Sequence, residues 1–197
     1  MKTAALALVA TLAVGTLAAN TPDSTSTSSG NQLERALAHG GRIRLDLSAG
    51  DYTISGTAAE TLRVRWRTRH ADDRVRASAD IRATAARVRV NGPRNDFHVQ
   101  IDVPRRSDLD IDLSAGDLKI QGIEGNKTLS MWAGDVTIEA GSPDLYRRID
   151  ASVRFGDLDA RPFGVSKGGI FRSFNWKGDG RYTVKASLFA GDLKIVR

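Results

Sequence analysis

The sequence contains no cysteine, only five prolines and few aromatic residues, which make up 6% of its 197 residues. The absence of cysteine excludes disulfides, thiol catalysis, thiolate metal sites and a lipid-modified N-terminal cysteine. Such a chain has to be held together by packing and backbone hydrogen bonds. With 41% hydrophobic and 26% charged residues and a formal net charge of +6, its composition is typical of one globular domain.

Long apolar runs are absent except at the N-terminus. Lys2 gives a positive start, Ala4 to Val14 is apolar apart from Thr11, and small residues fit cleavage after Ala18 or Ala19. Residues 1–19 therefore predict a signal peptide and an exported protein of the periplasm, the cell envelope or the extracellular space. The run is shorter than the roughly 20 residues of a membrane-spanning helix; retention as an anchor stays open as the alternative.

Residues 20–40 differ in composition from both flanking segments. The first part is rich in Ser and Thr and nearly lacks apolar residues, which predicts a flexible tether. Gln32 to His39 has the spacing of two helical turns, with Asn31 as the N-cap and Gly40 as the stop. We expect this short element to cover an end of the following domain.

The stretch from residue 109 to residue 120 has the pattern of two short strands joined by a turn. Apolar and polar residues alternate on both sides of the turn, which is typical of half-buried strands. The turn is Ser114-Ala115-Gly116-Asp117. Gly116 can adopt a positive φ, and Asp117 can accept hydrogen bonds from nearby backbone N–H groups.

The same strand–turn–strand pattern occurs five times. Its Gly–Asp corners are Gly50 and Asp51, Gly116 and Asp117, Gly134 and Asp135, Gly156 and Asp157, and Gly191 and Asp192. The corners at Gly116, Gly134 and Gly156 are 18 and 22 residues apart, whereas the gap to the corner at Gly191 is longer. A period of about 20 residues is typical of stacked coils, each of them one supersecondary unit. The sequence therefore predicts an all-β domain over residues 41–197, built as a β-solenoid-like stack of short strands with Gly–Asp corners. A β-sandwich is the alternative.

These residues resemble the bacterial putative-adhesin family of β-strand repeat domains, a domain of unknown function. The resemblance rests on the repeated corners, on the strand 97–104 leading directly into 109–111, and on the spacing from 123–125 to the corner at 134 and 135. It covers about residues 41 to 197. The resemblance implies an all-β solenoid-like fold, usually exported or membrane-tethered, and no established catalytic residues. The chain departs from the family in being Arg-rich between residues 63 and 106.

Carboxylates are the first candidates for chemistry. The corner aspartates could hold calcium, but the nine-residue calcium-binding repeat is absent, and each aspartate more simply satisfies the backbone donors of its own turn. Asp108, Asp110 and Asp112 could be the acid/base cluster of a polysaccharide-cleaving enzyme. Three aspartates on one strand face are more simply a solvated outer face with arginines opposite.

Arginines on alternating strand positions are the most distinctive feature of the sequence. They are Arg63, Arg65, Arg67 and Arg69 on one predicted strand, with Arg87 and Arg89 on another. They predict either a solvated face paired with the aspartates or a basic sheet face that binds a polyanion such as acidic glycan or lipid phosphate. Nucleic acid is not expected, because stacking aromatics are not interleaved on this face.

Neither a metal site nor a cofactor site is indicated. His39, His70 and His98 lie in separate segments without metal-ligand spacing, and no phosphate loop or hydrolase motif occurs. The three tryptophans, Trp66, Trp132 and Trp176, are expected in the core or a cap. We therefore expect a non-catalytic binding or structural module of the cell envelope with an unknown envelope partner. A polysaccharide-acting enzyme is the alternative, and self-association through a C-terminal edge strand around Lys194 to Arg197 is a further expectation.

Overall fold

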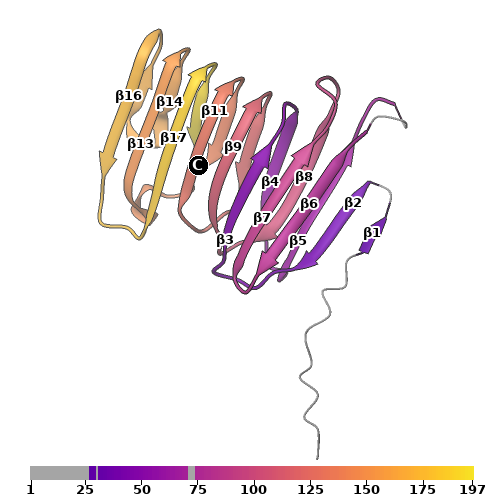
Figure 1. Ribbon diagram of the computed structural model, residues 1–197. Helices are drawn as coiled ribbons and strands as arrows, with labels where there is room; N and C mark the ends of the chain where they lie inside the picture. The colour runs from indigo at the N-terminus through magenta and orange to yellow at the C-terminus, as the bar shows by residue number, and fades with distance from the viewer. Residues whose placement is uncertain (1–26, 30, 71–73) are drawn as a thin grey trace, which may run out of the picture.

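The computed structural model describes residues 27–29, 31–70 and 74–197, which form an all-β structure of two mixed sheets (Figure 1). This confirms the predicted all-β class. The predicted signal peptide and most of the predicted tether lie outside the described residues. No helix among the described residues is long and apolar enough to cross a membrane.

Neighbouring strands in each sheet are hydrogen-bonded to one another in the following spatial order. The ten-stranded sheet contains β1 (Thr27–Ser29), β2 (Gln32–Ala36), β5 (Thr61–Arg67), β8 (His98–Pro104), β4 (Asp51–Thr57), β10 (Leu118–Gln121), β12 (Val136–Glu139), β18 (Leu193–Val196), β14 (Leu158–Ala160) and β15 (Val165–Lys167). The eight-stranded sheet contains β16 (Ile170–Lys177), β13 (Tyr146–Phe155), β17 (Tyr182–Ala190), β11 (Lys127–Ala133), β9 (Asp108–Ala115), β3 (Arg42–Leu47), β7 (Ala85–Asn91) and β6 (Arg76–Arg82). Two 3-10 turns, η1 (Pro143–Leu145) and η2 (Arg161–Phe163), complete the structure.

Strands of one sheet continue into matching strands of the other. The order β7, β3, β9, β11, β17, β13 in one sheet corresponds to β8, β4, β10, β12, β18, β14 in the other, with parallel pairing along both series. The pair β3/β4 lies between later pairs, and in Figure 1 the yellow β17 lies between the orange β13 and β11. The structure therefore does not show a solenoid of coils stacked in chain order, and the sheets are not closed. The alternative prediction, a β-sandwich, is compatible with two open sheets.

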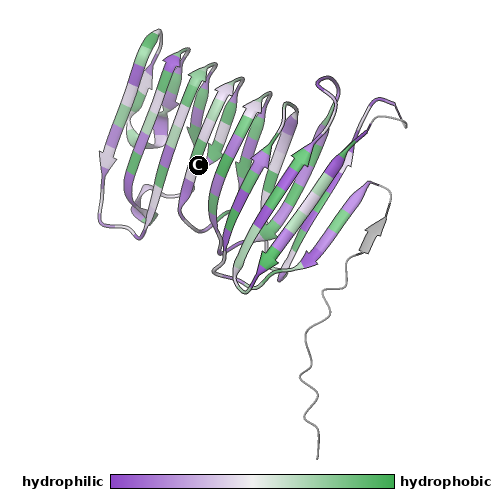
Figure 2. Ribbon diagram, viewed as in Figure 1, coloured by the Kyte–Doolittle hydropathy of each residue, from purple (hydrophilic) through white to green (hydrophobic). Residues whose placement is uncertain are grey.

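One hydrophobic core contains the inward-facing residues of both sheets. Along β3, for example, Ile43, Leu45 and Leu47 are buried while Arg44 and Asp46 are only partly buried. Figure 2 shows the same alternation of apolar and polar bands along most strands. Period-2 patterning therefore places the charged side chains on the two outer faces, where a ligand could reach them.

The N-terminal segment forms a strand where the sequence predicted helical turns. Gln32–Ala36 is β2, which pairs antiparallel with β5 and places Leu33 opposite Val64 and Glu34 opposite Arg63. Leu33 and Leu37 are both buried. A spacing of four residues fits one face of a strand as well as one face of a helix, and the open edge of β5 decides in favour of the strand.

The C-terminal strand is inside the ten-stranded sheet. β18 pairs with β12 on one side and, through Leu193 and Lys194, with β14 on the other. The expected C-terminal edge strand is therefore wrong for these two residues, because β14 covers them. Self-association through the end of the chain stays a prediction.

One lysine is buried between the sheets. Lys127 is 1% exposed, and its Nζ donates hydrogen bonds to the carbonyl oxygens of Ile123 (2.9 Å) and Gly125 (3.2 Å) and to the hydroxyl of Tyr146 (3.2 Å). Burial lowers the pKa of Lys127 to about 8, and the nearby Asp108 carboxylate opposes this shift only in part.

Candidate binding face of the eight-stranded sheet

The six arginines singled out in the sequence do not share one face. Arg63, Arg65 and Arg67 lie on β5 of the ten-stranded sheet, and Arg69 follows that strand. Arg87 and Arg89 lie on β7, in the eight-stranded sheet. The sequence could not show this separation, because alternation fixes the face of a strand but not the sheet to which the strand belongs.

Most of these arginines are held by carboxylates. Arg63 binds Glu34 (3.0 Å), Arg65 binds Asp102 (2.5 Å) and Arg69 binds Asp96 (3.1 Å). Arg87 and Arg89 both approach Asp46, at 2.8 and 3.7 Å. Arg67 has no ion-pair partner among the residues that the structure describes. The hydrogen bonds with Arg63 hold the pKa of the Glu34 carboxyl below its usual value.

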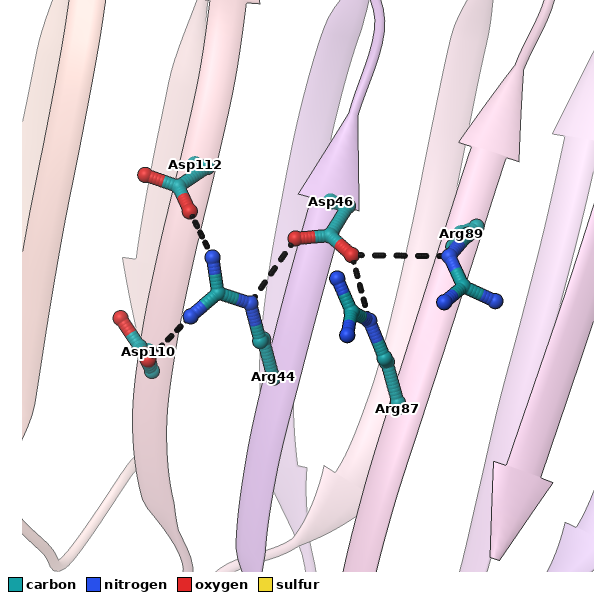
Figure 3. Close-up of polar contacts among 6 residues, drawn as sticks. All are labelled: Arg44, Asp46, Arg87, Arg89, Asp110 and Asp112. Carbon is teal, nitrogen blue, oxygen red and sulfur yellow. Dashed lines mark hydrogen bonds and ion pairs between the residues drawn. The ribbon is translucent and has the colours of Figure 1, made fainter.

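Arg44 is the centre of the largest charged network on the eight-stranded sheet (Figure 3). Its guanidinium binds Asp46 (3.0 Å) on its own strand and Asp110 (3.2 Å) and Asp112 (2.6 Å) on β9. The hydrogen bond to Asp46 is the main reason why the pKa of Arg44 is raised. Two of the three aspartates considered as an acid/base cluster are thus paired with arginine.

The arginines of this network lower the pKa of one of its carboxylates, Asp46. Partial burial raises the pKa of Asp46, but the hydrogen bonds from Arg87 and Arg44 outweigh this effect and hold the pKa below its usual value. The remaining member of the aspartate cluster, Asp108, accepts hydrogen bonds from the backbone N–H (2.8 Å) and the side-chain amide (3.0 Å) of Asn126. A general acid needs a raised pKa, so Asp46 is unsuited to that role.

The corner glycines form one column between the two sheets, which we call the glycine column. Its members, in spatial order, are Gly50, Gly116, Gly134, Gly191 and Gly156. All five have positive φ, from 115° to 156°. A Cβ at any of the last four would collide with the carbonyl oxygen of the preceding glycine. Only glycine allows the backbones of neighbouring corners to approach this closely.

Two corner aspartates accept a hydrogen bond from the backbone of a neighbouring corner. The expectation was that each would satisfy the backbone donors of its own turn. The backbone N–H of Asp192 donates to the Asp135 carboxylate, and that of Asp157 donates to the Asp192 carboxylate, each at 3.0 Å. Chain order hid these contacts, because the corner that follows in space is not the one that follows in sequence. At the other end of the column, Asp51 contacts Nδ1 of His98 at 3.1 Å.

A metal-ligand cluster is not found among the described residues, where no three His, Asp or Glu side chains gather closely enough to hold an ion. The corner aspartates are held apart by the strand spacing, since each belongs to a different coil. His39, His70 and His98 lie in separate places along the chain, on no common site.

A groove of about 890 Å³ crosses the outer face of the eight-stranded sheet. Its floor is a row of exposed serines on four adjacent strands, in the register Ser130, Ser187, Ser152, Ser173. Beside it runs a row of larger side chains, Trp132, Phe189, Arg154 and Phe171. Asp46, Asp112 and Arg89 of the charged network line the other end. We call this feature the serine–aromatic groove.

Trp132 corrects the expectation that the tryptophans lie in the core or a cap. Its side chain is 63% exposed and stacks on Phe189, with ring centroids 4.1 Å apart and planes 4° apart. Trp66 and Trp176 are partly buried against the core, as expected. The sequence did contain a signal for Trp132: it alternates with Leu129 and Met131, whose burial puts residue 132 on the outer face.

The comparisons with known proteins support the fold. No family model and no curated protein matches the sequence. The crystal structure of a putative cell adhesion protein from Clostridium sporogenes is similar to this chain, with a TM-score of 0.52 and 12% identity over 83% of this chain and 97% of that one. A putative adhesin from Parabacteroides distasonis aligns over 88% of this chain and 71% of its own at 12% identity, but its TM-score of 0.23 is too low to indicate a common fold.

Proposed function

We propose that the protein is a non-catalytic, adhesin-like binding module of the cell envelope, exported by its N-terminal segment. The observation that carries this proposal is the serine–aromatic groove, an open trough on a broad sheet whose nearby carboxylates are ion-paired. Such a surface can hold a ligand in many small contacts. Acid catalysis needs a raised pKa, whereas the pKa of the Asp46 carboxyl at the groove is lowered. The fold shared with the clostridial cell adhesion protein supports the same role.

A retention experiment tests the module. The protein, in the form in which the cell exports it, is mixed with sedimented envelope fragments, and the bound fraction is measured. We expect the folded protein to sediment with the envelope and urea-unfolded protein to be washed off. Equal recovery of both forms in the supernatant would contradict the proposal.

The rival class, a polysaccharide-acting enzyme, makes a different forecast. Asp46 and Asp112 both line the groove and are the carboxylates that a glycosidase would use there. We expect no new reducing ends when the protein is incubated with envelope polysaccharide. Release of reducing ends by the wild type, abolished in Asp112→Asn, would replace the module by the enzyme.

The finer proposal is that β5 contributes to binding an anionic glycan or lipid surface. Its support is Arg67, which is exposed, lacks an ion-pair partner within the described part of the chain, and borders a hollow with Arg69 and His98. Reversal of charge at Arg65 and Arg67 should weaken retention on anionic vesicles, and added salt should do the same. A matched reversal at Arg87, on the other sheet, should leave retention unchanged. Equal retention of all variants would reject the proposal.

A further inference from the structure

We propose that the serine–aromatic groove binds an acidic polysaccharide, with sugar rings against Trp132 and a sugar carboxylate on Arg154. This inference deepens the proposed function and rests on it, because it gives the module a site and a ligand class. The arginines chosen from the sequence as polyanion ligands are not those that line this end of the groove.

The side chains of the aromatic row are unusually exposed. Trp132 is 63% exposed, Phe171 69% and Phe155 46%, and these rings form one contiguous cluster through Phe189. Contiguous exposed apolar surface marks an interaction site. One face of Trp132 is covered by Phe189, so its other face is turned toward β9, where the small Ser114 leaves room. A flat free indole face suits the C–H face of a sugar ring.

The serine row supplies the polar half of such a site. The hydroxyls of Ser130, Ser187, Ser152 and Ser173 make no hydrogen bond to any described residue, and all four side chains are exposed. Each hydroxyl can both donate and accept, as can the hydroxyls of a sugar. Adjacent strands are about 4.8 Å apart, so the row offers a periodic set of hydrogen-bonding groups to an extended chain lying across the strands.

Charge decides in favour of an acidic ligand. At one end of the groove the arginines are neutralised by Asp46, Asp110 and Asp112. At the other end Arg154 lies over the rings of Phe171 and Phe189, 5.5 Å from each centroid, with no carboxylate at ion-pair distance among the described residues. A guanidinium stacked on aromatic rings is pre-oriented and free to bind a carboxylate in a bidentate manner.

The backbone at the end of the groove is strained in a way that keeps this arrangement. Phe171 has φ of 54°, a left-handed conformation that is rare for a bulky residue. This conformation occurs inside β16, between Ile170 and Arg172, which pair with β13 while Phe171 does not. Such strained conformations concentrate at binding sites. Here this conformation holds the Phe171 ring against Arg154.

Saccharide titration of the exported protein tests the inference. Polygalacturonate serves as the acidic probe and dextran as the neutral one, and binding is followed by calorimetry and tryptophan fluorescence. We expect polygalacturonate to bind and to change the fluorescence. Trp132→Ala should weaken binding about tenfold or more, as aromatic anchors do at other interfaces, whereas Trp132→Phe should retain most of it. Arg154→Gln should weaken binding several-fold and reduce its dependence on salt.

Two controls make the result specific. Arg76→Gln removes one exposed arginine from the opposite edge of the same sheet, and Leu145→Ala removes an exposed apolar side chain far from the groove. Both should bind like the wild type. Equal binding of Trp132→Ala, Arg154→Gln and the wild type would overturn the inference, as would equal binding of dextran and polygalacturonate, which would mean a neutral sugar site.

The outcome is separable from that of the proposed function. If the wild type and Trp132→Ala sediment equally with envelope fragments and polygalacturonate does not bind, the module stands and the groove is excluded as its site. If polygalacturonate binds at Trp132 but the protein does not sediment with envelope, the saccharide site is supported and the proposed role in the envelope is rejected.

Discussion

The carbonyl oxygen of Gly116 lies where a side chain on residue 134 would begin. A Cβ at position 134 would overlap this oxygen, and φ of Gly134 is 122°. The same relationship joins each neighbouring pair along the glycine column. The strands on both sides of the column therefore have a fixed separation, and the flat outer face that carries the groove depends on it.

The glycine column gives the first prediction. Gly134→Ala should lower the free energy of unfolding by about 3 kcal/mol or more, because it adds a backbone collision to an unfavourable φ. Gly164→Ala is the matched control, since its φ is 75° but nothing lies within 4 Å of the added Cβ. It should cost only about 1 kcal/mol. Urea unfolding followed by circular dichroism measures both, and equal losses would contradict the close stacking.

The second prediction concerns the corner aspartates. Asp135→Ala removes the acceptor of the Asp192 backbone N–H and should cost about 1 kcal/mol. Asp117→Ala should have little effect, because no described residue donates a hydrogen bond to its side chain. Hydrogen exchange at the Asp192 amide should accelerate in the first variant only. Unchanged exchange there would show that the contact between coils is not stabilising.

The third prediction concerns Arg44. Arg44→Gln should leave Asp46, Asp110 and Asp112 without their common partner and lower the urea midpoint at low salt. The loss should be modest and shrink at high salt, because these side chains are partly exposed. Arg42, on the same strand, has no carboxylate at ion-pair distance among the described residues, so Arg42→Gln serves as the control. Equal losses at low and high salt would contradict an electrostatic role.

The same substitution has a pH dependence with a definite sign. Because the pKa of Asp46 is lowered in the folded protein, its contribution is present above the unfolded pKa and is lost as pH falls through the folded pKa. The advantage of the wild type over Arg44→Gln should therefore shrink on acidification below about pH 4. A constant difference between pH 7 and the acid limb would be inconsistent with this assignment.

The next prediction concerns Lys127. Its pKa falls from 10.5 to about 8 on folding, so between these values the unfolded chain binds more protons and stability rises with pH. Relative to Lys127→Met, the wild type should gain about 2 kcal/mol between about pH 7.5 and about pH 9.5. Tyr52 and Tyr146, whose pKa values burial raises to about 12, stay protonated over this pH range and do not contribute to the difference. Parallel pH profiles for the two proteins would contradict a buried lysine.

Most strands could be predicted from the sequence, β2 being an exception, but their order in the sheets could not. Alternation and the Gly–Asp corner predict two strands where β9 and β10 lie, and burial of Leu109, Ile111 and Leu113 follows from period 2 alone. The predicted turn began too early, because Ser114 and Ala115 still belong to β9. No local pattern in the sequence of β3 predicts that its neighbours in the sheet are β7 and β9. Sheet order is set by long-range packing, and for that reason both the cross-coil aspartate contacts and the separation of the arginines were missed.

The candidate site shows the same limit. Serines at positions 130, 152 and 187 are unremarkable in the sequence because they lie far apart along it. They become a groove floor only when three strands are placed side by side in register. Trp132 could have been assigned to the outer face from its parity with Met131. Its stacking on Phe189 could not, because 57 residues separate the two.

The proposed function and the proposed site together require that envelope covers the serine–aromatic groove. Oxidative footprinting measures which face of the protein is covered. The protein is oxidised briefly with hydroxyl radicals, with and without envelope fragments, and modification at each tryptophan is read by mass spectrometry. We predict that envelope protects Trp132 strongly and leaves the partly buried Trp66, which belongs to the other sheet, unchanged. Equal oxidation of Trp132 in both conditions, with protection elsewhere, would contradict the account.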